Sequence, residues 1–367
     1  MMNIPATITG GNPPIPSQAL CAAEMLEGIE LPNGWKVIAK VPKGQNSTGG
    51  HFSVPYYVEK TERKKKRNAF LKALNFRRLA AEPDFARAVQ QHTTAFNFER
   101  ETLEFCKSKR LRRIAMLLDA GEYRTANNPL PVCYIIFELA EGGDARTQLA
   151  KLGRFNLAWT LRTLHNIAVG LQQLHSEGIA HQDLKPSNIL FFEAFGAKLA
   201  DLGCADKQNN PTRSPRGHLG IPGDSAYAPP ELFYGEIAAD WKVRRLGCDF
   251  YLLGSLIVFF FTGGASMTAV LQSKIHPAHS WLQWTGDYRS VLPYIRDAFE
   301  QALIEIESSV PQAVRPQVME MIRWLCEPDP KRRGHPTDLD RSQFNLERII
   351  SAFNVLATKV EYGLFKV

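Results

Sequence analysis

The sequence predicts an α+β fold with two lobes, a small β-rich lobe followed by a larger, mainly helical one. Short strand-like runs dominate residues 34–139, and apolar residues at helical spacing dominate the chain after Gly142. The 367 residues, 44% hydrophobic and 22% charged, can bury a sizeable core and exclude a disordered chain. We expect an N-terminal extension at 1–33, the small lobe at 34–139, the large lobe at 140–340 and a C-terminal helix packing on it at 341–367.

Composition narrows the class of protein. Lysine plus arginine number 44 and aspartate plus glutamate 37, and the net charge of +7 is too small to indicate a specific nucleic acid as partner. The six cysteines form no CxxC pair and the first residues lack the pattern of a secretory leader, so we expect reduced thiols and a cytoplasmic protein. The longest apolar stretch, Phe250–Thr262, is shorter than the roughly 20 residues that span a membrane, and it predicts a buried helix without membrane insertion.

The small lobe begins with a predicted hairpin, in which Trp35–Pro42 and His51–Lys60 flank a glycine-containing turn, and a third strand follows at Ala69–Phe76. The basic segment Glu62–Arg67 is suited to phosphate or an acidic protein, although a solvated hairpin tip is the simpler explanation. The remaining predicted elements are a helix at 79–107, strands at 114–118 and 132–137, a helix at 159–176, further helices from 244 and an amphipathic last helix at 343–360.

The segment HQDLKPSNIL (His181–Leu190), followed by Asp201-Leu202-Gly203, carries the most chemical information. An ionised aspartate accepts a proton from an attacking hydroxyl or binds Mg²⁺, and an asparagine amide oxygen is a neutral ligand for the same hard cation. Phosphoryl transfer needs these roles together, because its catalysis rests on positioning and charge neutralisation.

These motifs resemble the catalytic loop and the DFG motif of eukaryotic-type (Hanks-type) serine/threonine protein kinases. By this resemblance Asp183 is the catalytic base, Lys185 steadies the transferred phosphate, and Asn188 and Asp201 bind metal. Further motifs follow in the order of the family: Tyr227–Glu231 resembles the APE motif, Asp249 resembles the helix aspartate that supports the catalytic loop, and Arg333 resembles the arginine that pairs with Glu231.

Two further residues are expected on the same grounds. Lys72, in AFLK, resembles the strand lysine that contacts the α- and β-phosphates of ATP. Glu101 is the candidate for its ion-pair partner on the following helix, with Glu99 and Glu104 as alternatives, and the spacing to Ile114 favours Glu101.

The expected ATP site has a weak glycine-rich loop, because Gly44, Gly49 and Gly50 do not reproduce the GxGxxG pattern, and Phe52 would cover the adenine. In the segment between the lobes, Phe137 resembles the gatekeeper of the family. The other residues that the resemblance places against the nucleotide are Glu138 and Ala140 through their backbone, Asp144 at the ribose, and Leu190.

Three positions depart from the family pattern. Gln182 stands where many regulated kinases have arginine, so we expect activity that needs no phosphate on the activation loop. Leu202 replaces the phenylalanine of DFG and keeps its apolar character. Asp224 stands where the family usually has threonine, and its charge would repel Asp183 unless Lys185 compensates.

The resemblance implies an ATP- and Mg²⁺-dependent serine/threonine protein kinase, with Mn²⁺ as an alternative metal and a protein Ser or Thr hydroxyl as acceptor. The sequence leaves open whether the protein has a regulatory partner, and it identifies none. The main alternative is a pseudokinase that serves as a nucleotide-binding scaffold, and a small-molecule kinase is a third interpretation. The presence of Lys72, Asp183, Lys185, Asn188 and Asp201 favours catalysis over the scaffold.

Overall fold

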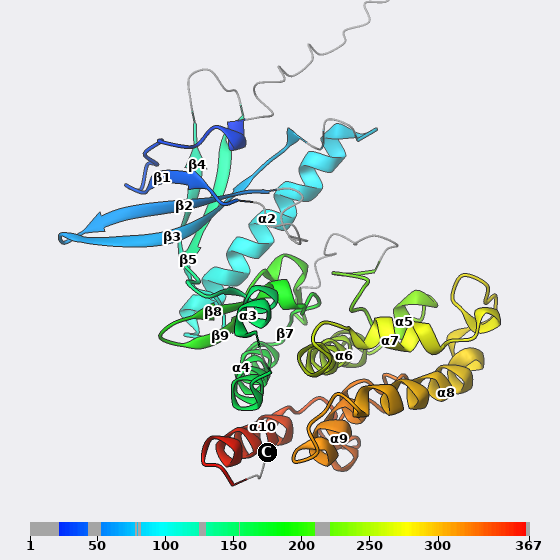
Figure 1. Cartoon of the computed structure of the whole chain (residues 1–367). Helices are drawn as coiled ribbons and strands as arrows, with labels where there is room; N and C mark the ends of the chain where they lie inside the picture. Colours follow the sequence, from blue (N-terminus) through cyan, green and yellow to red (C-terminus); the bar gives the residue numbers. More distant parts are fainter. Residues whose placement is uncertain are drawn as a thin grey trace, which may run out of the picture. The chain divides into compact units, whose positions relative to one another are not determined.

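A computed structural model describes residues 22–42, 53–77, 79, 82–124, 130–153, 155–209 and 221–364. The chain divides into two compact units, each described here by itself. The first unit comprises 1–46, 50–90 and 119–136, and the second comprises 47–49, 91–118 and 137–367. Sheet dominates the first and helix the second (Figure 1), and the predicted α+β class is confirmed.

The first unit is built on a five-stranded sheet with the order β1-β2-β3-β5-β4. Alternate side chains of the central strands are buried, among them Tyr56 and Val58 on one strand and Leu71 and Ala73 on the next, as expected where one face of a sheet covers a core. The strands are β1 (Lys36–Lys40), β2 (Ser53–Glu62), β3 (Lys65–Leu74), β4 (Leu117–Tyr123) and β5 (Val132–Glu138).

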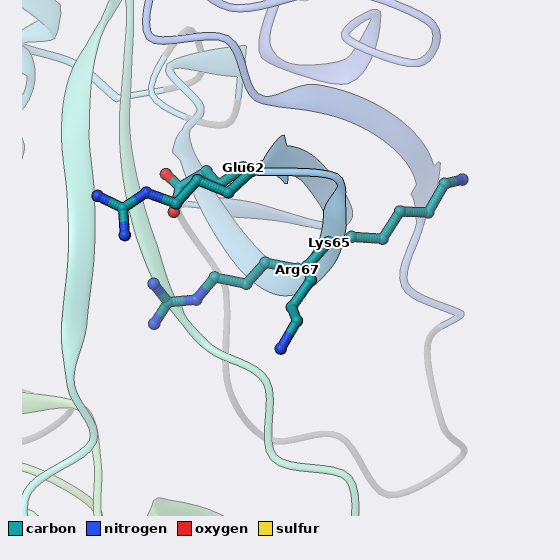
Figure 2. Close-up of a pocket in the computed structure, with 5 residues that line it drawn as sticks. Glu62, Lys65 and Arg67 are labelled. Atoms are coloured by element: carbon teal, nitrogen blue, oxygen red, sulfur yellow. The ribbon is translucent and has the colours of Figure 1, made fainter.

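The hairpin of β2 and β3 is tighter than the sequence predicted. Glu62 pairs with Lys65 in the antiparallel register, so the turn consists of Arg63 and Lys64 alone. Both have positive φ, 47° and 67°, which is the backbone of a two-residue type I′ turn. The basic segment is therefore mostly strand, and Glu62, Lys65 and Arg67 lie around a pocket at the hairpin tip (Figure 2).

Helix α2 (Phe85–Ser108) starts later than predicted, and most of it, from residue 91 onwards, belongs to the second unit together with the loop that follows it. This loop is held by strand β9 (Gly196–Leu199) of that unit, because Ala115 N donates to Leu199 O at 2.8 Å and Leu199 N donates to Arg113 O at 2.8 Å. These bonds delay the start of β4 to Leu117, whereas the sequence predicted a strand from residue 114.

The second unit is mainly helical, with short strands that carry the loops of the site. Strands β6, β8 and β9 form one small sheet, and β7 and β10 form another. The helices are α3 (Ala145–Leu152), α4 (Leu157–Ser176), α5 (Pro230–Phe233), α6 (Trp241–Thr262), α7 (Met267–Lys274), α8 (Tyr288–Glu307), α9 (Arg315–Leu325) and α10 (Glu347–Glu361), and the remaining strands are β6 (Gly143–Asp144), β7 (Ile179–Ala180), β8 (Ile189–Phe192) and β10 (Asp206–Lys207).

Helix α6 is the central core helix of this unit. Its side chains are buried from Leu246 to Phe261, Asp240 caps its start by accepting from Val243 N, and Gly263 ends it with a φ of 77°. By length and composition α6 could cross a membrane, but 89% of its apolar window is buried inside the protein. The predicted buried helix is thus confirmed.

Helix α10 packs along α4 (Figure 1). Phe353 and Leu356 are buried on its inner face, and the Arg162 guanidinium of α4 pairs with the Glu361 carboxylate at 2.6 Å. Gln172 of α4 also accepts a hydrogen bond from Leu346 N at 3.2 Å. The amphipathic pattern of the last helix therefore serves burial against the second unit.

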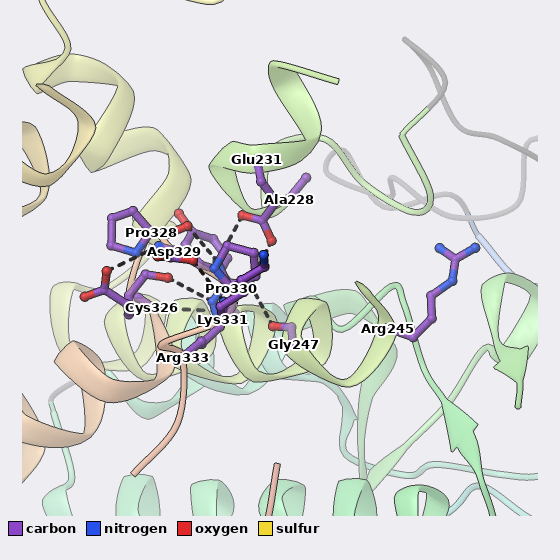
Figure 3. Close-up of polar contacts among 12 residues, drawn as sticks. Ala228, Glu231, Arg245, Gly247, Cys326, Pro328, Asp329, Pro330, Lys331 and Arg333 are labelled. Carbon is purple, nitrogen blue, oxygen red and sulfur yellow. Dashed lines mark hydrogen bonds and ion pairs between the residues drawn. The ribbon is translucent and has the colours of Figure 1, made fainter. Parts of the chain in front are cut away.

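A buried ion pair joins the start of α5 to the segment after α9. The Arg333 guanidinium is fully buried and binds both Glu231 oxygens, at 2.8 and 2.9 Å, and it donates to Gly247 O at 2.9 Å (Figure 3). Burial by itself lowers the pKa of Arg333, but the Glu231 carboxylate outweighs this effect and raises it. The predicted pairing of Arg333 with Glu231 is confirmed.

We predict that Arg333→Met lowers the free energy of unfolding by about 3–5 kcal/mol, because the Glu231 carboxylate stays buried without its partner. Urea unfolding followed by circular dichroism measures this loss. Arg323→Met, which removes a half-exposed pair with Glu300, is the matched control and is expected to cost at most about 1 kcal/mol. Equal losses in the two variants would contradict the prediction.

Candidate active site

The catalytic loop is held from α6 by one buried carboxylate. Asp249 Oδ2 accepts from His181 N at 2.7 Å, and Oδ1 accepts from Gln182 N at 2.8 Å. His175 Nε2 on α4 lies 2.8 Å from the same carboxylate. Because Gln182 has a φ of 65°, a strained conformation for a residue with a side chain, these bonds determine the shape of the loop.

Three of the predicted residues, Asp183, Lys185 and Asn188, contact one another in the following part of the loop. Asp183 Oδ2 accepts from Lys185 Nζ at 3.1 Å and from Asn188 Nδ2 at 3.0 Å, and Asn188 Nδ2 also donates to Asp183 O at 2.8 Å. All three side chains are buried. Asp183 is thus oriented by neighbours that are themselves buried.

The charges around Asp183 act against one another. Burial raises the pKa of Asp183, the Lys185 ammonium opposes that rise, and the Asp201 carboxylate adds to it. The net pKa is raised, which makes Asp183 a stronger base than a solvated aspartate. Burial lowers the pKa of Lys185, but Asp183 and other carboxylates outweigh this and raise it, so the ammonium stays charged.

Asp201 follows strand β9 and opens a short 3-10 turn at Leu202–Cys204. Its φ of 62° is in the left-handed region, and the side chain of Leu202 is fully buried directly after it. Ala200 N donates to Asn188 O at 2.9 Å, which couples the two predicted metal ligands through the backbone. Leu202 therefore keeps the apolar packing expected at this position.

The donor set fits Mg²⁺. The Asn188 amide nitrogen donates to Asp183 Oδ2, and its Oδ1 accepts only a long hydrogen bond of 3.5 Å from the Ser187 hydroxyl. An amide oxygen and the Asp201 carboxylate are both oxygen ligands of the kind that Mg²⁺ prefers. Mg²⁺ is commonly bound through one or two protein oxygens with the rest supplied by phosphate and water. Among the described residues there is no cluster of three or more His, Cys, Asp or Glu suited to a metal.

Helix α2 corrects one prediction. Glu101, predicted as the partner of Lys72, is exposed, whereas Glu99 is buried on the face that also buries Leu103. A carboxylate oxygen of Glu99 lies 3.7 Å from where a Cβ on Gly203 would stand, next to Asp201. Two helical residues differ by about 200° in direction, so Glu101 faces away from the site. Glu99, kept as an alternative in the sequence analysis, is the glutamate at this site.

Only some of the other residues predicted to contact the nucleotide are among the residues that the structure describes. Lys72 lies on β3 in the first unit, half-buried and opposite Pro55. The predicted loop residues Gly44, Gly49, Gly50 and Phe52 lie outside the described residues.

Glu138, the last residue of β5, uses one of its two backbone groups inside the protein. Its backbone N–H donates to Met116 O at 3.0 Å, so the predicted contact of its backbone with adenine would be made by its carbonyl oxygen. Its side chain accepts from Met116 N at 2.7 Å and pairs with the buried Lys198 at 2.6 Å. Sequence reasoning missed Lys198, whose partner Glu138 comes from a distant strand. Phe137, the expected gatekeeper, is buried.

Ala140, Asp144 and Leu190 lie on neighbouring segments. Ala140 and Leu190 pack against one small apolar cluster, and Asp144 is the register partner of Leu190 between β6 and β8. Asp144 Oδ1 caps α3 by accepting from Thr147 N at 2.8 Å. The predicted ribose contact of Asp144 would therefore depend on its other oxygen.

Asp224 adds a third carboxylate beside Lys185. Its backbone N donates to Asp183 Oδ1 at 2.8 Å, and its Oδ2 lies 3.6 Å from Lys185 Nζ. Asp224 Oδ1 accepts from Ala226 N at 3.0 Å, which fixes the side chain. Lys185 thus compensates the charge repulsion expected between Asp224 and Asp183.

Gly223, which sequence reasoning also missed, packs directly against the backbone of the catalytic loop. Its φ is 72°, and a Cβ there would lie 2.4 Å from Gln182 O and 2.8 Å from Asp183 Oδ1. These distances exclude any side chain without displacement of the loop. The only local signal is a glycine directly before Asp224.

Comparisons with known proteins agree with this geometry. Residues 86–344 match the family model described as "Protein kinase domain". The chain is 27% identical to "Aurora kinase" of Dictyostelium discoideum over 215 residues, 58% of this chain and 50% of that protein. It is 32% identical to "Serine/threonine-protein kinase RUNKEL" of Arabidopsis thaliana over 130 residues, 35% of this chain and 9% of that protein.

A bacterial relative is equally distant. The chain is 30% identical to "Probable serine/threonine-protein kinase PknB" of Corynebacterium glutamicum over 141 residues, 38% of this chain and 22% of that protein. The alignments therefore cover half or less of the length of these relatives.

We predict that Gly223→Ala lowers kcat about a hundredfold, because the added methyl group displaces Asp183. Gly235→Ala is the matched control, since Gly235 has the same φ of 72° and nothing within 4 Å of the new methyl group. Steady-state kinetics on both variants, each shown to be folded by circular dichroism, separates steric displacement of Asp183 from backbone strain. Similar kcat values in the two variants would refute the explanation.

Proposed function

Because the chain belongs to the protein kinase domain family, we propose that it is a serine/threonine protein kinase that transfers the γ-phosphoryl group of ATP to Ser or Thr hydroxyls of protein substrates. Mg²⁺, held by Asn188 and Asp201, would neutralise phosphate charge when bound. The observation that carries the proposal is the buried Asp183 carboxylate, oriented by Lys185, Asn188 and the Asp224 backbone.

In the proposed reaction the acceptor hydroxyl oxygen forms a bond to the γ-phosphorus, and the bond from this phosphorus to the β–γ bridging oxygen breaks. The hydroxyl proton goes to Asp183, whose raised pKa favours its acceptance. The Lys185 ammonium, 3.1 Å from Asp183 Oδ2, would stabilise negative charge on the transferred group. ADP and a phosphorylated side chain are the products.

We also propose that the kinase needs no phosphate on its activation segment. The supporting observation is Gln182, whose side chain is committed to internal contacts. Its Nε2 donates to Arg245 O at 2.9 Å and to Asp249 Oδ1 at 3.0 Å. A neutral amide held in this way offers no positive charge to a phosphate.

The proposed activity is tested with purified protein, Mg²⁺ and γ-labelled ATP, alongside Asp183→Asn and Lys72→Ala. We expect label on Ser or Thr of a protein substrate with the wild type and a loss of at least about a hundredfold in both variants. Equilibrium binding of a fluorescent ATP analogue is measured in parallel. Nucleotide binding without transfer would instead establish the pseudokinase scaffold, and label confined to small hydroxyl compounds would establish a small-molecule kinase.

Replacement of Thr212, Ser214 and Ser225 together by Ala is expected to leave kcat within about threefold of the wild type, because position 182 lacks the guanidinium that would bind a loop phosphate. The same phosphotransfer assay measures this, with circular dichroism as the control for folding. Complete loss of activity in a folded variant would show that a hydroxyl or its phosphate is required.

A further inference from the structure

One face of α6 holds two different parts of the candidate active site. Trp241, Arg245 and Asp249 are spaced four residues apart, so their side chains leave the helix on the same side. Asp249 holds the catalytic loop through His181 N and Gln182 N. Trp241 and Arg245 contact the segment that follows the metal-binding motif.

The target of both contacts is Asp206 on β10. Its Oδ1 accepts from Trp241 Nε1 at 2.9 Å, and its Oδ2 lies 2.9 Å from Arg245 Nε. The carboxylate is 3% exposed and the Arg245 side chain 20% exposed, so water screens the pair weakly. Arg245 Nη1 also donates to Gln182 Oε1 at 3.2 Å, and its side chain lies apart from the contacts around Arg333 (Figure 3).

These contacts connect the segment that carries Asp201 with the loop that carries Asp183. Strand β10 follows Asp201 after a single 3-10 turn, and it pairs antiparallel with β7 through Asp206 and Ala180. Strand β7 leads directly into His181 and the catalytic loop. The ion pair between Arg245 and Asp206 therefore anchors the chain on the far side of Asp201, while Asp249 anchors the loop that carries Asp183.

We propose that the Arg245–Asp206 ion pair, supported by Trp241 and Gln182, is a built-in anchor that does the work of an activation-segment phosphate. The anchor positions Asp201 relative to Asp183 by tying β10 to α6. This inference rests on the proposed kinase function and deepens it, since it names the residues that would make activity independent of phosphorylation. Arg245 and Asp206 are positioning residues, because neither touches the reacting atoms.

The charge balance explains why a phosphate would add little here. In regulated kinases that the sequence resembles, an arginine precedes the catalytic aspartate and receives the loop phosphate. In this chain that position is the neutral Gln182, and the nearby charge of Arg245 is already neutralised by a carboxylate.

The test compares Asp206→Asn, Arg245→Gln and the double variant with wild-type protein, all treated with a protein phosphatase and verified by intact mass. We expect the dephosphorylated wild type to keep its activity, and each single variant to lose about tenfold to a hundredfold in kcat. The KM for the protein substrate should change less than about twofold, because no substrate contact is removed. The double variant should lose no more activity than the more impaired of the two single variants, since both changes break the same ion pair.

Two controls separate positioning from general stability. Arg296→Gln removes a partly buried ion pair with Glu327 and should leave kcat unchanged. Asp206→Glu keeps the charge and should retain most of the activity.

Amide hydrogen exchange gives a second test, which on the dephosphorylated wild type does not depend on the folding of any variant. The amides of β10 should be protected from exchange in the wild type, and Arg245→Gln should lose this protection.

The outcomes are distinct. A wild type that transfers no phosphate contradicts the proposed function and the inference with it. An active wild type that loses its activity on dephosphorylation overturns the inference alone. The inference is also wrong if the folded single variants keep wild-type kcat, or if β10 exchanges freely in the active, dephosphorylated protein.

Discussion

The structure of the site depends on a carboxylate that takes no part in the chemistry. Asp249 is fully buried, and a buried charge is stable only when its hydrogen bonds are satisfied. It accepts from two consecutive backbone N–H groups, His181 N and Gln182 N, and from the His175 ring. A core helix thereby sets the backbone of the catalytic loop, including the strained φ of Gln182. Rigid burial of α6 is therefore what gives Asp183 a defined position.

Around Asp183 the protein places more negative than positive charge. Asp183, Asp201 and Asp224 surround Lys185, which contacts Asp183 at 3.1 Å and Asp224 at 3.6 Å. Such a site is electrostatically unfavourable by itself and becomes favourable with divalent cations or basic groups nearby. Burial is the main cause of the raised pKa of Asp183, and the Asp201 carboxylate adds to it. The arrangement is suited to metal-assisted phosphoryl transfer and ill suited to binding an anion alone.

Sequence reasoning succeeded where the spacing along the chain determines the geometry. Asp183, Lys185 and Asn188 lie within one loop, so their convergence follows from a motif of a few residues. Sequence reasoning failed at Glu101. A step of two residues along α2 leads from the buried Glu99 to the exposed Glu101, and the spacing of apolar residues in this helix is too irregular to tell the two faces apart. Glu138 was placed correctly at the end of β5, but its side chain and N–H are used by Lys198 and Met116.

The amino-acid pattern alone was sufficient for the α+β class and the buried character of α6. The resemblance of the motifs to the kinase family was sufficient for the pairing of Arg333 with Glu231. Tertiary packing decided which glutamate faces Asp201, why Gly223 must lack a side chain, and which cation holds Asp206. These features join residues from separate elements, and no local spacing encodes the distance between two surfaces. Hydrogen bonds and steric contacts at 3–4 Å arise only once the elements have packed.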